Sequence, residues 1–358
     1  MANSLKDRLI EQITLDGPLP VDAYMAACLL DPVDGYYTKH VALGAEGDFL
    51  TAPLISQMFG EMIGVWVAQT WQALGSPAAF RLVEIGGGNG TLTSDILRVV
   101  ARVPGLPEAA KVTLVEPSQR LRALQADKVP SATFLPSIDQ VPEDLPVILI
   151  ANELLDCLPA RQFVRTETGW FERRIGLQDG ALAFGLVPAG EDFAPPFEAA
   201  IGDLVEISPA QTRLAENLAL LLKQATGAAL LIDYGRDQPE PGDTLQALYR
   251  HQKHDPLEAP GQHDLTVWAD FPSVAAVAAR TGAKVSPIVT QRNFLQQLGI
   301  DARHAALMQR NPDHAEKLQR QYDRLMAPDQ MGTLFKVLGL AFPPAVNLFA
   351  LEAAAPDL

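Results

Sequence analysis

The stretch that decides the fold is Leu82-Val83-Glu84-Ile85-Gly86-Gly87-Gly88-Asn89-Gly90-Thr91-Leu92. A short apolar run leads into a glycine-rich turn and then into a helical pattern, which predicts a strand–turn–helix unit. Glycine has no Cβ, so the chain can turn sharply and approach a ligand closely, while the first helical turn offers free N–H groups. A tight turn without a ligand is the alternative, but three alternate glycines after an acidic residue favour a ligand site.

The spacing of these glycines distinguishes between cofactor classes. The G-x-G-x-x-G pattern of nicotinamide and flavin folds requires glycine at the sixth position counted from Gly86, where this chain has Thr91. The pattern present is acidic-x-Gly-x-Gly-x-Gly, formed by Glu84, Gly86, Gly88 and Gly90. It resembles the first motif of S-adenosylmethionine (SAM)-dependent methyltransferases, and it disfavours a dehydrogenase.

Four short apolar runs, separated by helices, follow one another along the chain from this motif. They cover residues 81–85, 111–116, 147–151 and 228–234. Strands that alternate with helices predict an α/β fold with a parallel sheet covered on both faces. Between the third and fourth runs, alternating residues around two glycine turns predict an antiparallel β insertion at about 160–210.

The residues before the glycine motif show a different, mainly helical, sequence pattern. Helical patterns cover residues 5–13, ending at Gly17-Pro18, and residues 21–30 and 57–74, and Tyr36-Tyr37 is expected to begin an extended piece. We therefore expect a mostly helical extension over residues 1–80 and a second domain over residues 81–358. A further helical segment is expected at about 272–330.

Acidic residues follow two of the predicted strands. Glu116 ends the second run, and a carboxylate at such a strand tip can accept hydrogen bonds from both hydroxyls of a ribose. An exposed strand end that merely carries Glu is the alternative for Glu116 taken alone. Asn152, Glu153 and Asp156 follow the third run, at the sheet edge where open α/β folds bind ligands.

The acids after the third run suit one class of methyl acceptor. Methyl transfer is an in-line displacement, so an enzyme mainly orients the nucleophile and helps it to lose a proton. Carboxylates can hold the N–H groups of a guanidinium, and Glu153 and Asp156 are candidates for this role. Alternatively, Asn152 caps the next helix and Asp156 is a solvated acid at its start.

Composition and charge exclude several classes of protein. The chain has 358 residues, which at roughly 150 residues per domain corresponds to two domains or one large domain with insertions. It is 48% hydrophobic, unlike a disordered chain, and no apolar run approaches the length of a membrane span. With 28 Lys and Arg against 43 Asp and Glu, the net charge is −15, which disfavours nucleic acid and favours a cationic protein partner.

The cysteines and the N-terminus bear on location. Cys28 and Cys157 lie far apart without C-x-x-C spacing, which predicts neither a disulfide framework nor a thiolate metal site. Asp7 and Glu11 lie in a helical pattern that is unlike a signal or transit peptide. We therefore expect a cytoplasmic protein.

Matches along nearly the whole chain make the resemblance more specific. The chain resembles the family of SAM-dependent methyltransferases related to the mitochondrial complex I assembly factor MidA. Beside the glycine motif, the matching stretches are Gly35-Tyr36-Tyr37, residues 47–53, 56–61 and 152–159, Ile232-Asp233-Tyr234-Gly235, residues 243–246, Pro260-Gly261, Asp264-Leu265-Thr266 and residues 331–336.

This resemblance implies a Rossmann-like, seven-stranded SAM-dependent methyltransferase fold with an N-terminal extension and SAM as cofactor. It also implies ω-N-methylation of a protein arginine, with a respiratory complex I subunit as the substrate known for the mitochondrial branch. A non-catalytic SAM-binding chaperone for the assembly of complex I-type enzymes is the alternative.

The resemblance also implies roles for individual residues. A loop over residues 47–53, with Gly47, Asp48, Thr51 and Pro53, would lie across the cofactor. The stretch from Glu84 to Gly90 would hold the methionine and ribose side of SAM, and Glu116 its ribose. Catalytic roles near the methyl group would fall to Asn152, Glu153 and Asp233.

Two positions depart from the family pattern. The family usually has Pro where this chain has Gly87, which is expected to loosen the turn. The family also has a histidine where this chain reads Val267-Trp268-Ala269-Asp270-Phe271, so no role of that histidine carries over.

Other active-site classes find little support. His251, His254 and His263 with Asp264 could form a metal site, but they lie in a Pro- and Gly-rich loop where surface histidines are common. No serine lies in the Gly-x-Ser-x-Gly elbow of a hydrolase. No metal is predicted.

Overall fold

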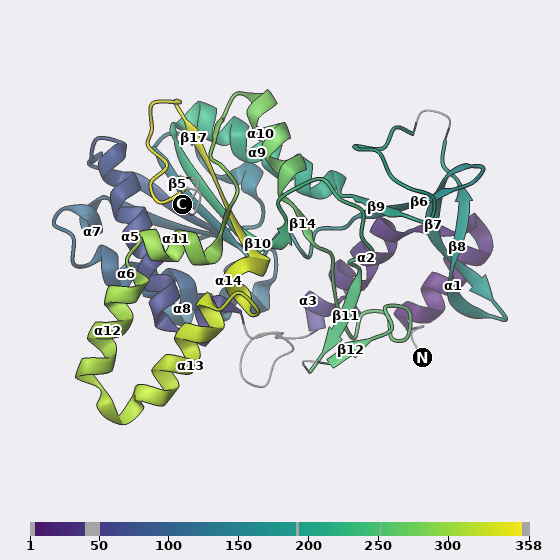
Figure 1. Ribbon diagram of the computed structural model, residues 1–358, viewed down its shortest axis with the longest axis horizontal. Helices are drawn as coiled ribbons and strands as arrows, with labels where there is room; N and C mark the ends of the chain where they lie inside the picture. The colour runs from purple at the N-terminus through teal and green to yellow at the C-terminus, as the bar shows by residue number, and fades with distance from the viewer. Residues whose placement is uncertain (1–3, 40–50, 191–192, 251, 353–358) are drawn as a thin grey trace. The chain divides into compact units, whose positions relative to one another are not determined.

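The computed structural model describes residues 4–39, 51–190, 193–250 and 252–352 (Figure 1). The chain forms two compact units. Unit 1 comprises residues 1–49, 155–213 and 236–272, and unit 2 comprises residues 50–154, 214–235 and 273–358. Each unit is therefore assembled from three separate stretches of sequence.

Unit 2 is built on a mostly parallel sheet. Seven strands lie in the order β15 (Lys284–Val285), β17 (Phe335–Phe342), β10 (Gly227–Arg236), β5 (Val147–Asn152), β2 (Phe80–Ile85), β3 (Ala110–Val115) and β4 (Thr133–Leu135). The five strands from β10 to β4 run parallel, and β17 runs antiparallel to β10. The predicted α/β fold is confirmed. Beside these seven strands, two further short strands pair with the sheet, which gives nine among the described residues.

The four predicted strands correspond to β2, β3, β5 and β10. Every residue of β5 and β10 is buried, which explains why both read as continuous apolar runs rather than as alternating ones. The short strand β16 (Val289–Thr290) pairs with β17. No strand was expected at β4, β15, β16 or β17.

Helices cover both faces of this sheet (Figure 1). One side carries α5 (Gln57–Ala73), α6 (Thr91–Val100) and α8 (Gln119–Lys128), and the other carries α9 (Pro209–Ala225) and α10 (Phe271–Thr281), whose first residues belong to unit 1. The other helices of unit 2 are α4 (Ala52–Ile55), α7 (Leu106–Ala109), η1 (Ile138–Gln140), α11 (Gln291–Gln297), α12 (Ile300–Arg310), η2 (Pro312–His314), α13 (Ala315–Met326) and α14 (Met331–Leu334). The helices predicted over residues 57–74 and within 272–330 are confirmed.

Unit 1 combines helices with antiparallel strands. Its larger sheet has the order β1 (Leu19–Pro20), β7 (Gly169–Gln178), β6 (Arg161–Thr166) and β9 (Leu204–Ile207), with β8 (Ala181–Pro188) paired to β7. A smaller sheet contains β12 (Gln252–His254), β11 (Gln246–Tyr249) and β13 (Asp264–Thr266), and β14 (Ala269–Asp270) follows. The predicted antiparallel insertion is confirmed.

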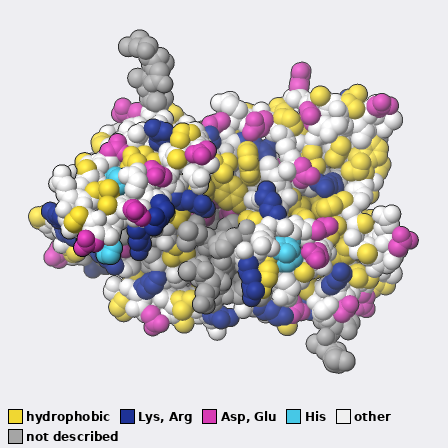
Figure 2. Space-filling model, turned by 60° about the horizontal axis from the view of Figure 1, so that its bottom comes forward, with side chains coloured by type: hydrophobic (Ala, Val, Ile, Leu, Met, Phe, Trp, Pro, Cys, Tyr) yellow, Lys and Arg dark blue, Asp and Glu magenta, His cyan; other side chains and the backbone are white. Residues whose placement is uncertain are grey.

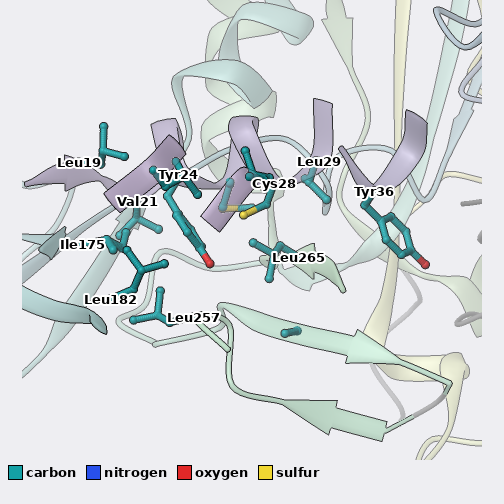
Figure 3. Close-up of a cluster of buried hydrophobic side chains, with 14 of the residues drawn as sticks. Leu19, Val21, Tyr24, Cys28, Leu29, Tyr36, Ile175, Leu182, Leu257 and Leu265 are labelled. Atoms are coloured by element: carbon teal, nitrogen blue, oxygen red, sulfur yellow. The ribbon is translucent and has the colours of Figure 1, made fainter. Parts of the chain in front are cut away.

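The core of unit 1 lies between its helices and strands (Figure 3). Helices α1 (Leu5–Asp16) and α2 (Val21–Leu30) contribute buried side chains, among them Tyr24 and Cys28, which meet Ile175 of β7 and Leu265 of β13. As the sequence predicts, α1 ends before Gly17, whose φ of 88° is one that glycine adopts readily.

The expectation of an extended piece at Tyr36-Tyr37 is wrong. Residues Tyr36–Lys39 form the single helical turn α3, and the amides of Thr38 and Lys39 both donate to the Gly35 carbonyl over 3.0 Å. Tyr36 is fully buried in the unit 1 core (Figure 3). Burial of this ring therefore outweighs the β preference of two adjacent tyrosines.

Among the described residues, no helix is both long and apolar enough to cross a membrane.

Candidate active site

The glycine motif forms a left-handed turn between β2 and α6. Gly86, Gly88 and Gly90 have φ angles of 68°, 53° and 79°. The Gly86 amide donates to the Val115 carbonyl at 3.0 Å, and the Gly90 amide donates to the Gly87 carbonyl at 2.8 Å. Since three residues in one turn have positive φ, glycine at these positions avoids a steric cost that most side chains would impose.

Gly87 is constrained by the acid of the motif. A Cβ atom built on Gly87 would lie 2.9 Å from both Cδ and Oε2 of Glu84. With Glu84 in this position, the backbone at Gly87 has no room for a side chain. The turn therefore packs closely over the Glu84 carboxylate at Gly87.

Glu84 is a buried carboxylate beneath this turn. It is 4% exposed and accepts a short hydrogen bond from the Thr93 hydroxyl at the start of α6. Burial raises the pKa of Glu84 to about 7, and the negative charge of Glu116 adds to the rise, while Thr93 opposes it. The structure thus places an acid that titrates near neutral pH beside the glycine turn.

Glu116 follows β3, the strand next to β2. It is also 4% exposed, and its Oε1 accepts a hydrogen bond from the Ser118 amide at 2.8 Å. Burial raises the pKa of Glu116, while the Ser118 amide, the Arg122 guanidinium and the Gln125 side chain lower it. Two carboxylates therefore lie at the carboxyl ends of neighbouring parallel strands.

Asn152 and Glu153 lie at the end of β5, on the other side of β2. The Glu153 amide donates to the Ile232 carbonyl of β10 at 2.8 Å, and its φ of 51° is unusual for a residue with a side chain. Oε1 of Glu153 accepts hydrogen bonds from the Ala52 amide and from Nδ2 of Asn152, both at 3.0 Å. Among the described residues, Oδ1 of Asn152 is buried without a hydrogen-bond partner.

The backbone at Glu153 is strained. A non-glycine residue with positive φ costs of order 1–3 kcal/mol and persists where the surroundings hold it, most often at functional sites. Here the strained conformation places the Glu153 carboxylate within reach of α4. The buried acceptor of Asn152 beside it suits a ligand that carries N–H groups.

The other expected site residues fall in three places. Asp233 of β10 is fully buried, follows the register partner of Asn152, and its Oδ1 accepts from the Tyr234 amide at 2.8 Å. Thr51 precedes α4, and Pro53 is buried within α4. Gly47 and Asp48 lie outside the described residues.

Asp156 is brought into a different setting from Glu153. It belongs to unit 1, where it is buried and its carbonyl accepts from the Val267 amide at 2.9 Å. It is one of the negative groups that, after burial, raise the pKa of Tyr37. The residue is therefore not the solvated acid that one alternative proposed.

Three contacts of the site were not expected from the sequence. Thr93 binds Glu84, the Ala52 amide binds Glu153, and Gln125 of α8 donates from Nε2 to the Gly88 carbonyl at 2.9 Å. Thr93 could have been suspected from its place in the first turn after the motif. No local pattern singles out Ala52 or Gln125, because their roles depend on which elements pack together.

The histidines of the expected metal alternative lie in unit 1. His254 and His263 stack with ring centroids 4.5 Å apart, while His251 is outside the described residues. Within the described ranges, no group of three or more His, Cys, Asp or Glu is arranged to hold a metal ion. The chemistry available at the strand ends of unit 2 is that of carboxylates, one amide side chain and backbone donors.

Comparisons with known proteins point to one family. The model of the S-adenosyl-L-methionine-dependent methyltransferase family matches residues 62–289. The protein arginine methyltransferase NDUFAF7, mitochondrial, of Rattus norvegicus is 37% identical, with 93% of this chain and 83% of the relative covered. The protein of the same name from Homo sapiens is 35% identical, with 93% and 82% covered.

Solved structures agree with these relatives. A methyltransferase-type protein from Burkholderia thailandensis, solved with S-adenosyl-homocysteine bound, matches with a TM-score of 0.86 and 27% identity, covering 98% of this chain and 95% of that chain. A native structure of a Burkholderia thailandensis protein of the same superfamily matches with a TM-score of 0.84 and 26% identity, covering 98% and 94%. The fold expected from the glycine motif is thus confirmed over nearly the whole chain.

The expected cytoplasmic location is wrong, because the curated relatives are named as mitochondrial proteins. Free thiols such as Cys28 and Cys157 indicate reducing conditions and do not identify a compartment.

Proposed function

This chain belongs to the S-adenosyl-L-methionine-dependent methyltransferase family, and from this premise we propose that it methylates an arginine side chain of a protein. Its cofactor is SAM. The arginine and the protein substrate come from the names of relatives that are 35–37% identical over most of the chain. The observation that carries the proposal is the Glu153 carboxylate, which Ala52 and Asn152 hold at the end of β5.

The glycine turn and the two acids beside it are the proposed cofactor site. Glu84 and Glu116 are buried acids at adjacent strand ends, and neither has a Lys or Arg within ion-pair distance among the described residues. SAM carries an ammonium group and ribose hydroxyls, which are the donors that such carboxylates require. Gly86, Gly88 and Gly90 leave the backbone open to close approach, and residues 47–53 complete the proposed site.

The roles of the residues near the methyl group follow from their hydrogen-bonding chemistry. When bound, SAM supplies an electrophilic methyl group on its sulfonium. The Glu153 carboxylate accepts N–H groups of the guanidinium and orients one nitrogen toward the methyl carbon, and Oδ1 of Asn152 accepts a further N–H. With SAM bound, the Glu153 carboxylate or a water molecule would accept the proton that the guanidinium nitrogen loses on methylation. Asp233 is proposed as a third catalytic residue, beside Glu153 and Asn152.

Charge supports a basic protein substrate. Unit 1 carries 11 Lys and Arg against 24 Asp and Glu, a formal charge of −13 out of −15 for the chain. Such a field attracts cationic segments and raises their rate of encounter. On the face that Figure 2 shows, acidic side chains are interspersed with basic and apolar ones.

Within this function, a subunit of a complex I-type respiratory enzyme is the proposed substrate. The support is the resemblance to the MidA-related family. The same charge that favours a cationic protein disfavours nucleic acid as the acceptor.

The test is transfer of label from tritiated SAM to protein in a lysate, followed by mapping of the labelled residue. Label on an arginine supports the proposal, and recovery from a complex I-type subunit supports its finer form. Label found only on nucleic acid or small molecules contradicts it. Binding of SAM and of a partner without any transfer would instead favour a non-catalytic assembly chaperone.

A further inference from the structure

Gln125 is a buried polar residue of α8 with a specific contact to the glycine turn. Its side chain is fully buried, and Nε2 donates to the Gly88 carbonyl at 2.9 Å across 37 positions of sequence. The carbonyl it holds belongs to the middle glycine of the left-handed turn, whose φ is 53°. An amide side chain of α8 thus restrains the middle of the turn.

The packing of α8 against the turn is close as well as polar. A Cβ atom built on Gly90 would lie 3.3 Å from Cα of Gln125. The Gly86 and Gly90 amides and the Gly87 and Gly90 carbonyls make backbone hydrogen bonds, whereas the Gly88 carbonyl accepts from the Gln125 side chain. The position of Gly88 therefore depends on α8.

The same helix holds the Glu116 carboxylate. Ser118, which caps α8, donates its amide to Oε1 of Glu116 at 2.8 Å, and Nε of Arg122 donates to the Glu116 carbonyl. The Gln125 side chain also favours the ionised form of Glu116, against the effect of burial on its pKa. Helix α8 thus contacts both the glycine turn, through Gln125, and the acid of the next strand, through Ser118.

We propose that Gln125 is a positioning residue for SAM, whose amide group fixes the Gly88 carbonyl in the geometry that the cofactor needs. The inference rests on the cofactor site proposed above. Among the described residues, Oε1 of Gln125 has no hydrogen-bond partner. The NH2 group, which donates to the Gly88 carbonyl, is therefore the functional part of the amide. Losing NH2 alone should therefore have nearly the effect of losing the whole amide.

Two substitutions separate this role from general packing. Gln125→Met keeps the length of the side chain but loses the donor, and should raise the SAM dissociation constant about tenfold, as loss of a hydrogen bond to a positioned group does. The turnover number at saturating SAM should stay within about twofold, because Glu153 and Asn152 are untouched. Gln119→Met, at an exposed position of the same helix, is the matched control and should bind SAM like the wild type.

Gln125→Glu adds a second test, the pH dependence of SAM affinity, which a change in packing alone would not alter. At pH 8 a carboxylate would face the Gly88 carbonyl and Glu116, so SAM binding should be weaker than in Gln125→Met. At pH 6 a protonated glutamic acid can donate to Gly88, so the ratio of variant to wild-type affinity should recover several-fold. Isothermal titration calorimetry at both pH values measures this ratio, and melting temperatures without SAM show whether each variant folds.

The outcomes distinguish this inference from the site on which it rests. Wild-type SAM affinity in Gln125→Met, together with weakened binding in Gly88→Val and Glu116→Ala, would overturn the role of Gln125 and leave the cofactor site standing. Unchanged binding in all three would overturn both. Should Gln125→Met fail to fold, the pH dependence of Gln125→Glu decides, and a ratio that does not change between pH 6 and 8 rejects the proposal.

Discussion

The backbone amide of Ala52 donates a hydrogen bond to the Glu153 carboxylate at 3.0 Å, although the two residues are 101 positions apart. The same oxygen accepts from Nδ2 of Asn152 at 3.0 Å. Two of the donors to this carboxylate, the Ala52 amide and the Asn152 side chain, are neutral groups from α4 and β5. That arrangement suits a group that must accept N–H bonds from a cationic substrate.

Glu153→Gln should impair methyl transfer much more than SAM binding. Glutamine keeps the shape and one acceptor oxygen but loses the charge that stabilises the guanidinium as the methyl arrives. The rate of transfer should fall roughly tenfold or more, which is about 1.4 kcal/mol of transition-state stabilisation. Single-turnover kinetics measure the transfer, and Glu143→Gln, at an exposed acid of unit 2, is the control. A Glu153→Gln protein with the wild-type rate would exclude the catalytic role.

Gly88→Val and Glu116→Ala should each weaken SAM binding. Valine is strained at the φ of 53° that Gly88 adopts, and Glu116→Ala removes the proposed acceptor for the ribose. We expect the dissociation constant from calorimetry to rise about tenfold or more in both folded variants. Gly190→Val is the control for the first, because Gly190 is exposed with open space around its Cβ position. Normal SAM affinity in both variants would contradict the site.

The affinity for SAM should increase with pH through neutrality. The pKa of Glu84 is raised from 4.5 to about 7, chiefly by burial, and donors on SAM favour the ionised carboxylate. Binding should therefore release a proton near pH 7, which calorimetry in buffers of different ionisation enthalpy detects. Glu84→Gln should show no such release. A wild-type affinity that is constant from pH 6 to 8 would contradict the assignment.

The stability of the cofactor-free protein should show the opposite trend. Because the folded pKa of Glu84 lies above its unfolded value, the stabilising contribution is complete below about pH 4.5 and is lost as pH rises through about 7. The free energy of unfolding of the wild type, relative to Glu84→Gln, should therefore fall between pH 5 and 8. Urea titrations at several pH values measure this difference, and a difference that grows with pH would be inconsistent with a raised pKa.

Gly227→Ala should destabilise the central sheet. Gly227 begins β10 with a φ of 154°, and a Cβ atom there would lie 1.9 Å from the Val147 carbonyl oxygen of β5. Strand displacement or strain should cost about 3 kcal/mol of the free energy of unfolding. Gly185→Ala is the control, because no atom lies within 4 Å of the Cβ position at Gly185. Equal urea midpoints for the two variants would argue against this packing.

Sequence patterns predicted those elements whose signal is local. The fully buried strands β5 and β10 read as continuous apolar runs, and Gly17 marks the end of α1. The prediction of an extended segment at Tyr36-Tyr37 was wrong, because burial of Tyr36, a tertiary effect, overrides the β propensity of the two tyrosines. Strand β17 went unexpected although every residue from Val337 to Ala341 is buried.

By itself, the sequence determined the strand–turn–helix unit around Glu84 and Gly88 and the family to which the chain belongs, because glycine spacing and apolar runs are properties of neighbouring residues. Only the tertiary structure decided that Gln125 holds Gly88, that Ala52 holds Glu153, and that Asp156 belongs to a different unit from Glu153. These relationships depend on strand order and helix packing. Such contacts form between residues far apart in the chain, where no local pattern records which side chains will meet.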